Sequence, residues 1–168
     1  ILAQFLSIAA YSMDGFAFAA ESFVGQAMGQ RSRKAVRRAS VVMSQWGGGC
    51  ALASSAVFLA LGPALIDLMT TAPDVRMEAR SYLPWLAAAI ALSAPGWILD
   101  GIFIGATRTR EMRNAMLVSG LIYAVAIVVC APRFGNAGLW AALIVLNMAR
   151  AVTLGWRYPA LERAAADP

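Results

Sequence analysis

The sequence predicts an all-α fold, a polytopic bundle of membrane-spanning helices, and three observations support this prediction. Of the 168 residues, 60% are apolar and only 14% are charged. A soluble domain is about half apolar and a quarter charged, and folding would leave roughly a third of the surface of such a chain exposed to water. The apolar residues also occur in runs long enough to cross a bilayer, and most basic residues fall between these runs.

Five membrane-spanning helices are predicted, because each crossing needs about 20 mostly apolar residues. We place them at about residues 2–28, 40–61, 73–106, 111–131 and 136–158. Residues 63–69 are expected to extend the second helix along the membrane interface. A capping-box pattern beginning at Thr71 marks the start of the third helix. Pro132 and Pro159 are expected to end the fourth and fifth helices.

The basic residues predict the orientation of the chain. Eleven of the 14 lysines and arginines fall on one side, with five at residues 31–38, three at residues 108–113, and three at Arg150, Arg157 and Arg163. Because positive charge favours the cytoplasmic side, we expect the chain to start outside, cross five times and end in the cytoplasm. A cytoplasmic anchor explains the basic run better than a nucleic-acid patch does, so no nucleic-acid partner is expected.

Three carboxylates fall inside the predicted helices: Asp14, Glu21 and Asp100. Asp14 lies about 22 Å above the cytoplasmic end of its helix, and Glu21 follows two turns later on nearly the same face. A carboxylate at this depth is costly and usually faces a bundle interior or an aqueous cavity. We interpret the three as parts of a pathway for ions, protons or cationic substrates. The alternative is that they form interhelix hydrogen bonds, or that Glu21 pairs with an arginine of residues 31–38.

Polar and aromatic side chains near these acids extend the candidate pathway. Tyr11 lies one turn before Asp14, and Gln45 and Trp46 directly precede three glycines in the second helix. Aromatic faces attract cationic guests, and the glycines predict either a hinge beside a cavity or tight packing. The aromatic rings are equally consistent with a lipid-facing or packed position.

Enzymatic chemistry is poorly supported by this composition. The sequence contains no histidine, which excludes histidine-based triads and imidazole metal sites. The two aspartates that an intramembrane aspartyl protease would need lack the Gly-x-Gly-Asp signature of that class. Cys50 and Cys130 lie in apolar runs and are expected to pack as small hydrophobic residues. We therefore expect neither an enzyme nor a bound cofactor or metal.

Several segments resemble the MATE family of transporters, and the DinF-like branch in particular. Residues 11–21 (YSMDGFAFAAE) and 24–29 (VGQAMG) resemble the eighth helix of that family. Residues 100–116 (DGIFIGATRTREMRNAM) resemble the end of the tenth helix and the start of the eleventh. Residues 70–75 and 83–85 are similar to the outer segment that leads into the tenth helix.

The resemblance implies that residues 1–168 form part of a C-terminal lobe, the eighth to twelfth helices of a twelve-helix transporter with two lobes. It implies a secondary antiporter of the bacterial inner membrane that exports cationic or amphipathic compounds by alternating access. Protons or sodium ions would be the coupling ions. Partners would be small substrates, membrane lipids and the N-terminal lobe. In the DinF-like branch the aspartates credited with proton coupling lie in that first lobe, and the tenth-helix carboxylate of the NorM-like branch is replaced here by Ser93.

Two other functions remain open from the residues alone. A flippase for lipid-linked sugars would share the larger superfamily, but such proteins line their cavities with basic residues, whereas the intramembrane charges here are acidic. A membrane scaffold would use the buried acids only to hold helices together and would have a dry, closed seam.

Overall fold

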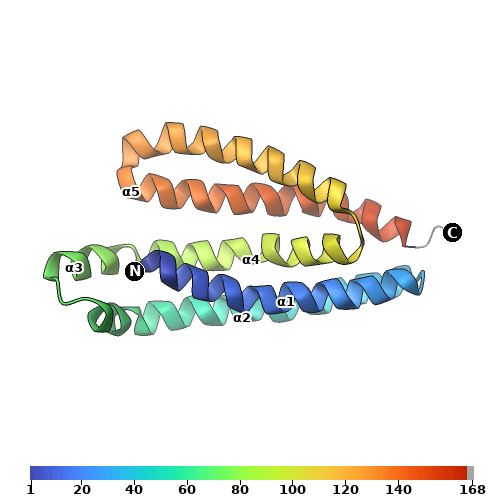
Figure 1. The fold of residues 1–168 in the computed structure, drawn as a ribbon, viewed down its shortest axis with the longest axis horizontal. Coiled ribbons are helices and arrows are strands. Elements are labelled where there is room, and N and C mark those ends of the chain that lie inside the picture. The colour runs from blue at the N-terminus through green and yellow to red at the C-terminus, as the bar shows by residue number, and fades with distance from the viewer. Residues whose placement is uncertain (166–168) are drawn as a thin grey trace.

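The computed structural model describes residues 1–165, which form helices and contain no strand. The helices are α1 (Leu2–Gly29), α2 (Arg33–Met69), α3 (Pro73–Ser81), α4 (Leu83–Gly105) and α5 (Thr109–Ala164). Helices α1 and α4 run in the same direction, α2 runs antiparallel to them, and the three pack against one another (Figure 1). Helix α5 lies on the other side of α4, so α4 is the central element of the bundle.

Helix α5 is a hairpin of two antiparallel legs, which matches the predicted pair of crossings. Gly135 adopts φ 55° and ψ −128°, a positive φ that favours glycine, and it turns the chain between a first leg (residues 109–134) and a second leg (residues 136–164). The second leg packs closely on α4: a Cβ added at Gly96 would lie only 3.3 Å from the Asn147 carbonyl oxygen. The first leg forms the outer layer of the molecule (Figure 1).

The loops alternate between the two ends of the bundle. The start of α1, helix α3 and the turn of α5 lie at one end (Figure 1). The turn between α1 and α2, the loop between α4 and α5, and the last turns of α5 lie at the other. This arrangement groups the basic segments 31–38 and 108–113 at a single end, as the charge pattern predicts.

The predicted third helix, residues 73–106, is wrong as a continuous element. It is divided at Tyr82 into α3 and α4. Pro84 follows in the first turn of α4, and a proline disfavours helical backbone in the residue before it and lacks a donor for the preceding turn. Helix α3 is polar, and its Arg76 and Arg80 pair with Asp67 of α2 at 3.5 and 2.5 Å. It therefore caps the end of the bundle instead of continuing the crossing.

Two other boundaries differ from the prediction. Helix α2 begins at Arg33, so most of the basic segment is helical, and it continues through Pro63 to Met69. Helix α5 continues past Pro159 to Ala164 instead of ending at the proline. Leu161 and Ala165 are buried with Val36 and Ala106, and this packing outweighs the hydrogen bond that the proline removes.

Three helices are long and apolar enough to cross a membrane: α2, α4 and α5. Helix α1 is not among them, and it carries the acids Asp14 and Glu21. Large apolar side chains cover the outer faces of α2 and α5, including Leu121 and Val128, which are 70% and 73% exposed. Such surfaces are unfavourable in water and favourable in lipid, so the chain is an integral membrane protein.

Candidate functional site

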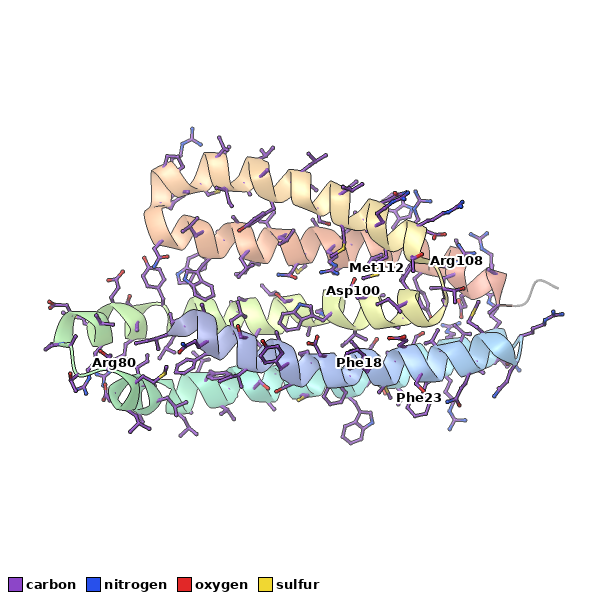
Figure 2. The ribbon with its side chains drawn as sticks, viewed as in Figure 1. Phe18, Phe23, Arg80, Asp100, Arg108 and Met112 are labelled. Carbon is purple, nitrogen blue, oxygen red and sulfur yellow. The ribbon has the colours of Figure 1, made fainter. Side chains whose placement is uncertain are left out.

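Asp100 forms an ion pair with Arg150 between α4 and the second leg of α5. The Arg150 Nη2 and Asp100 Oδ2 atoms are 2.5 Å apart, and the side chains are 17% and 12% exposed. Figure 2 shows Asp100 on the side of α4 that faces α5. A buried charge is tolerated when it is paired, so Arg150 neutralises Asp100 within the bundle. This contact supports the bundle-stabilising interpretation of Asp100 over a free cavity carboxylate.

Arg150 is therefore misplaced by the charge pattern, which groups it with the cytoplasmic surface cations. Its side chain lies inside the bundle because Asp100 offers the compensating charge at the same depth. The pair is incompletely satisfied, since Asp100 Oδ1 and Arg150 Nε are buried without a hydrogen-bond partner. The position of Arg150 within the apolar run 142–154 is the feature of the sequence that could have indicated a buried arginine.

Two glycines beside Asp100 allow α4 to approach α1 closely. A Cβ added at Gly101 would lie 2.2 Å from the Ala17 carbonyl oxygen, and one at Gly105 would lie 2.4 Å from that of Glu21. Gly101 and Gly105, four residues apart, thus form a backbone contact between the two parallel helices. Asp100, one residue before Gly101, therefore points away from this contact, toward Arg150.

The face of α1 that points away from α2 and α4 carries a line of polar and aromatic side chains. Its members recur every three or four residues and are all exposed: Gln4, Ser7, Tyr11, Asp14, Phe18 and Ser22. We call this line the α1 polar stripe. The buried face of α1 includes Phe5, Met13 and Val24 instead. Asp14 has no ion-pair partner among residues 1–165, and Tyr11 is 74% exposed.

The other predicted pathway residues do not converge on Asp14 and Tyr11 in this chain. Glu21 is half-buried against α4 and has no ion pair among the described residues, so its predicted partner in residues 31–38 is absent. Gln45 and Trp46 are exposed on α2, and Trp46 is 68% exposed. The following glycines do not interrupt α2, and Gly47 packs against Ile98.

The anionic partner of the basic segment is Glu162, which lies beyond Pro159, where the sequence predicts that the fifth helix ends. Its carboxylate lies 3.5 Å from the Arg33 guanidinium and 3.9 Å from that of Arg37. Helix α2 has no acidic residue in its own first turn, and a helix N-terminus carries partial positive charge. Glu162 supplies the missing negative charge from another helix, which requires α5 to continue past Pro159.

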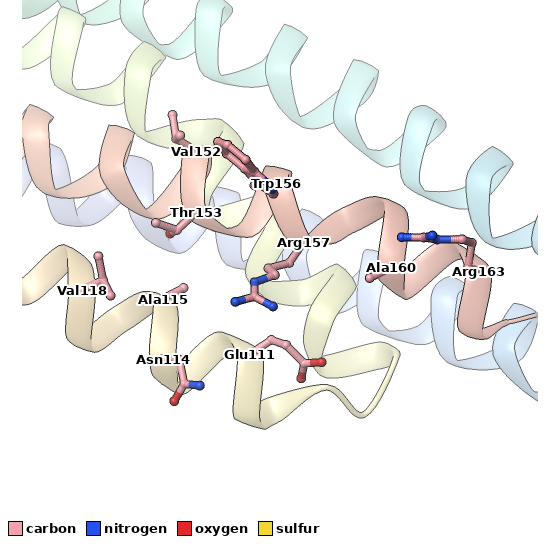
Figure 3. A pocket seen from close by; sticks show the side chains of 10 residues that line it. All are labelled: Glu111, Asn114, Ala115, Val118, Val152, Thr153, Trp156, Arg157, Ala160 and Arg163. Atoms are coloured by element: carbon pink, nitrogen blue, oxygen red, sulfur yellow. The ribbon is translucent and has the colours of Figure 1, made fainter.

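A cavity of about 640 Å³ lies between the two legs of α5 near the basic end of the bundle. Figure 3 shows Arg157 between the legs, with Glu111 and Asn114 on the first leg and Trp156 on the second. None of the predicted pathway residues lines it. Residues 1–165 also contain no cluster of three His, Cys, Asp or Glu side chains that could hold a metal ion.

Comparisons with known proteins agree with this architecture. The MatE family model matches residues 1–132. The chain is 36% identical over 165 residues to DNA damage-inducible protein F of Escherichia coli, covering 94% of this chain and 34% of that protein. It is 28% identical over 144 residues to Protein DETOXIFICATION 44, chloroplastic, of Arabidopsis thaliana, covering 86% and 28%. The chain spans about a third of the length of these curated relatives.

A solved structure shares the fold. The crystal structure of the eukaryotic MATE transporter AtDTX14 superposes with a TM-score of 0.88 at 19% sequence identity, covering 98% of this chain and 39% of that one. This match supports the fold, and the family model and the Escherichia coli relative support the predicted DinF-like resemblance. The chain therefore belongs to the MatE family, whose members are membrane transporters and not enzymes.

Proposed function

We propose that this chain is part of a secondary antiporter that exports small cationic or amphipathic compounds by alternating access. The observation that carries the proposal is the α1 polar stripe, with Asp14 exposed and unpaired on it. A carboxylate facing lipid at this depth is costly, so the stripe fits the wall of an aqueous cavity. An N-terminal lobe of the complete polypeptide would form the opposite wall.

The coupling that we propose is competition for Asp14. A carboxyl group holds either a proton or, when ionised, a cationic substrate, because a nearby cation favours the ionised form. Protons entering from one side and substrate leaving from the other would then be linked through one site. Tyr11 and Phe18, which flank Asp14 on the stripe, offer ring faces to a cation. Sodium is the alternative coupling ion.

Asp100 has a different part in this proposal. Arg150 already supplies its counter-charge at 2.5 Å, so Asp100 is a weaker candidate for a substrate cation than Asp14. Glu21, Gln45 and Trp46 remain predicted pathway residues, with Glu21 closest along the helix to the stripe. The comparison with Asp14 makes the two acids separable by experiment.

Transport by the complete polypeptide in proteoliposomes tests the proposal. We expect efflux of a fluorescent lipophilic cation when a proton gradient is imposed, or when a sodium gradient replaces it. Asp14→Asn should reduce gradient-driven efflux at least tenfold while the protein stays in the membrane. The matched control, Asp74→Asn, removes the same charge from an exposed position on α3 and should leave efflux unchanged. Equal efflux by wild type and Asp14→Asn would remove Asp14 from the mechanism.

The same assay separates the competing functions. A flippase would move an anionic lipid-linked substrate and no cation, and a scaffold would move neither. The proposed location is the bacterial inner membrane, with the start of the chain outside. Labelling with an impermeant maleimide tests this orientation in variants that lack Cys50 and Cys130. Asn136→Cys should react in intact cells, and Ser32→Cys should not.

A further inference from the structure

A groove runs between α2 and the second leg of α5 at the basic end of the bundle. Its volume is about 550 Å³. Leu99 and Ile102 of α4 form its floor, and α2 and α5, which contact one another little, form its sides. Arg37, Ser40 and Tyr158 line it near the end of the bundle, and Ser44 and Gln45 line it deeper along α2. We call it the α2–α5 groove.

Two buried hydroxyl oxygens that line this groove, Ser40 Oγ and Tyr158 OH, form no hydrogen bond of standard geometry with the protein. Ser40 is only 4% exposed, and a buried hydroxyl without a partner is destabilising. The Ser40 hydroxyl lies near enough to interact with the Tyr158 hydroxyl, and Glu162 and Arg37 act on that hydroxyl by charge. Two hydroxyls from different helices that meet at one place can both donate hydrogen bonds to a bound acceptor.

The charge at the mouth indicates an anion. Arg33 and Arg37 share the single carboxylate of Glu162, which leaves one net positive charge. Both guanidinium groups keep donors free, since their side chains are 54% and 72% exposed. A phosphate oxygen accepts hydrogen bonds from hydroxyls and from arginine.

The groove also has the polarity of a lipid site. Arg37 lies one turn from the start of α2, and Gln45 lies about 12 Å deeper, with Val41, Leu99 and Ile102 between those depths. A headgroup at the basic end would place an acyl chain along these apolar residues. We propose that the α2–α5 groove binds an anionic phospholipid, with its phosphate held by Arg37, Ser40 and Tyr158. Nothing in this proposal depends on the transport mechanism.

Native mass spectrometry of the complete polypeptide tests the site, with dioleoyl phosphatidylglycerol and dioleoyl phosphatidylcholine as probes. We expect wild type to retain phosphatidylglycerol more strongly than phosphatidylcholine. The neutral double variant Ser40→Ala/Tyr158→Phe should weaken phosphatidylglycerol binding about tenfold, since it removes two hydroxyl donors. Tyr123→Phe, on the first leg of α5, is the matched control and should bind as wild type does.

A second pair of variants separates the site from general surface charge. Arg37→Gln and Lys34→Gln remove the same charge one turn apart, but only Arg37 lines the groove. Arg37→Gln should weaken binding roughly fivefold more than Lys34→Gln. If the double variant is not monodisperse, Ser40→Ala alone, which removes a hydroxyl without a partner, is used in its place.

Three results would overturn the proposal. The first is unchanged phosphatidylglycerol binding in the hydroxyl variants, and the second is equal binding of the two lipids by wild type. The third is displacement of phosphatidylglycerol by millimolar inorganic phosphate, which would show that the site takes free phosphate instead of a lipid.

Discussion

Helix α4 and the first leg of α5 are both apolar, yet they have opposite burial. In the most apolar stretch of α4, 61% of the residues are buried. In the most apolar stretch of α5 only 11% are buried, although its mean hydropathy is higher. Along the first leg the buried positions are the small residues Ala115 and Ser119. The large side chains, such as Leu117, Leu121 and Val125, face outward.

The difference shows that burial in this protein follows size and polarity more than hydropathy. Lipid is as apolar as leucine, so a leucine gains little by leaving it. Glycines, serines and paired charges gain more from the interior, where they allow close helix contact or find partners. Helix α4 contains Gly96, Gly101, Asp100 and Ser93 on buried positions, and this content places it at the centre.

The largest effect that we expect comes from breaking the ion pair of α4. Asp100→Asn or Arg150→Gln should each lower the free energy of unfolding by about 3–5 kcal/mol, because each leaves a buried charge unpaired. The double variant should recover part of this loss. The corresponding pair of the first leg, Arg108–Glu111, is at a helix end and more exposed, so Glu111→Gln should cost about 1 kcal/mol or less. SDS-induced unfolding in mixed micelles measures all four, and equal costs at the two sites would contradict the comparison.

A smaller loss is expected from a methyl group placed in the α1–α4 contact. Gly101→Ala should cost about 3 kcal/mol, at the upper end for overpacking, since its Cβ would meet backbone that has no freedom to rotate away. Gly120→Ala on the first leg has open space and should be neutral or slightly stabilising. Thermal unfolding in the same detergent compares them, and a neutral Gly101→Ala would show that the two helices separate readily.

Truncation of one leucine in each region tests the role of lipid directly. Leu86 of α4 is fully buried and Leu121 of the first leg is 70% exposed. Leu86→Ala should cost about 2 kcal/mol, the low end for cores, because the cavity remains while the transfer contribution largely cancels in an apolar solvent. Leu121→Ala should change stability by about 0.5 kcal/mol or less. A large loss at Leu121 in unfolding titrations would mean that protein, and not lipid, covers the first leg.

The smallest effect is expected at the polar end of the molecule. Arg80→Gln removes a pairing with Asp67 that is exposed at the junction of α2 and α3, and Arg76 remains as a second partner. The expected loss is below about 1 kcal/mol. Arg133→Gln, in the exposed turn of α5, serves as the control. Differential scanning fluorimetry at low and high salt should show any Arg80 contribution shrinking as salt rises.

The sequence predicts the long apolar helices α2, α4 and α5 well, because lipid imposes a fixed length on each crossing, whereas α1, also predicted as a crossing, is not apolar enough to be counted among them. It fails at Tyr82 and Pro159, where local proline effects and tertiary packing have opposite outcomes. The break at Tyr82 occurs where the helix is polar, and the continuation past Pro159 occurs where Leu161 is buried. Hydropathy alone does not distinguish Pro84, which follows the break, from Pro159, through which the helix continues.

The candidate site was predictable in its acids and not in their partners. The cost of a carboxylate at bilayer depth identifies Asp14 and Asp100 equally. Whether each is paired depends on which helix lies opposite, and Arg150 meets Asp100 only because the second leg of α5 packs on α4. The role of Glu162 is not predictable for the same reason, since the arginines that it pairs with lie about 125 residues earlier in the chain.

The pairing of Asp100 with Arg150 also has a consequence for how the protein is made. The ribosome adds about 5–20 residues per second, so the arginine is synthesised about 3–10 s after the aspartate. During this interval α4 enters the membrane with an acid that has no counter-charge, and the whole first leg of α5 must follow before the second leg arrives. The turn at Gly135 then brings the arginine back alongside α4. The counter-charge of Asp100 is thus supplied by a segment that emerges two crossings later.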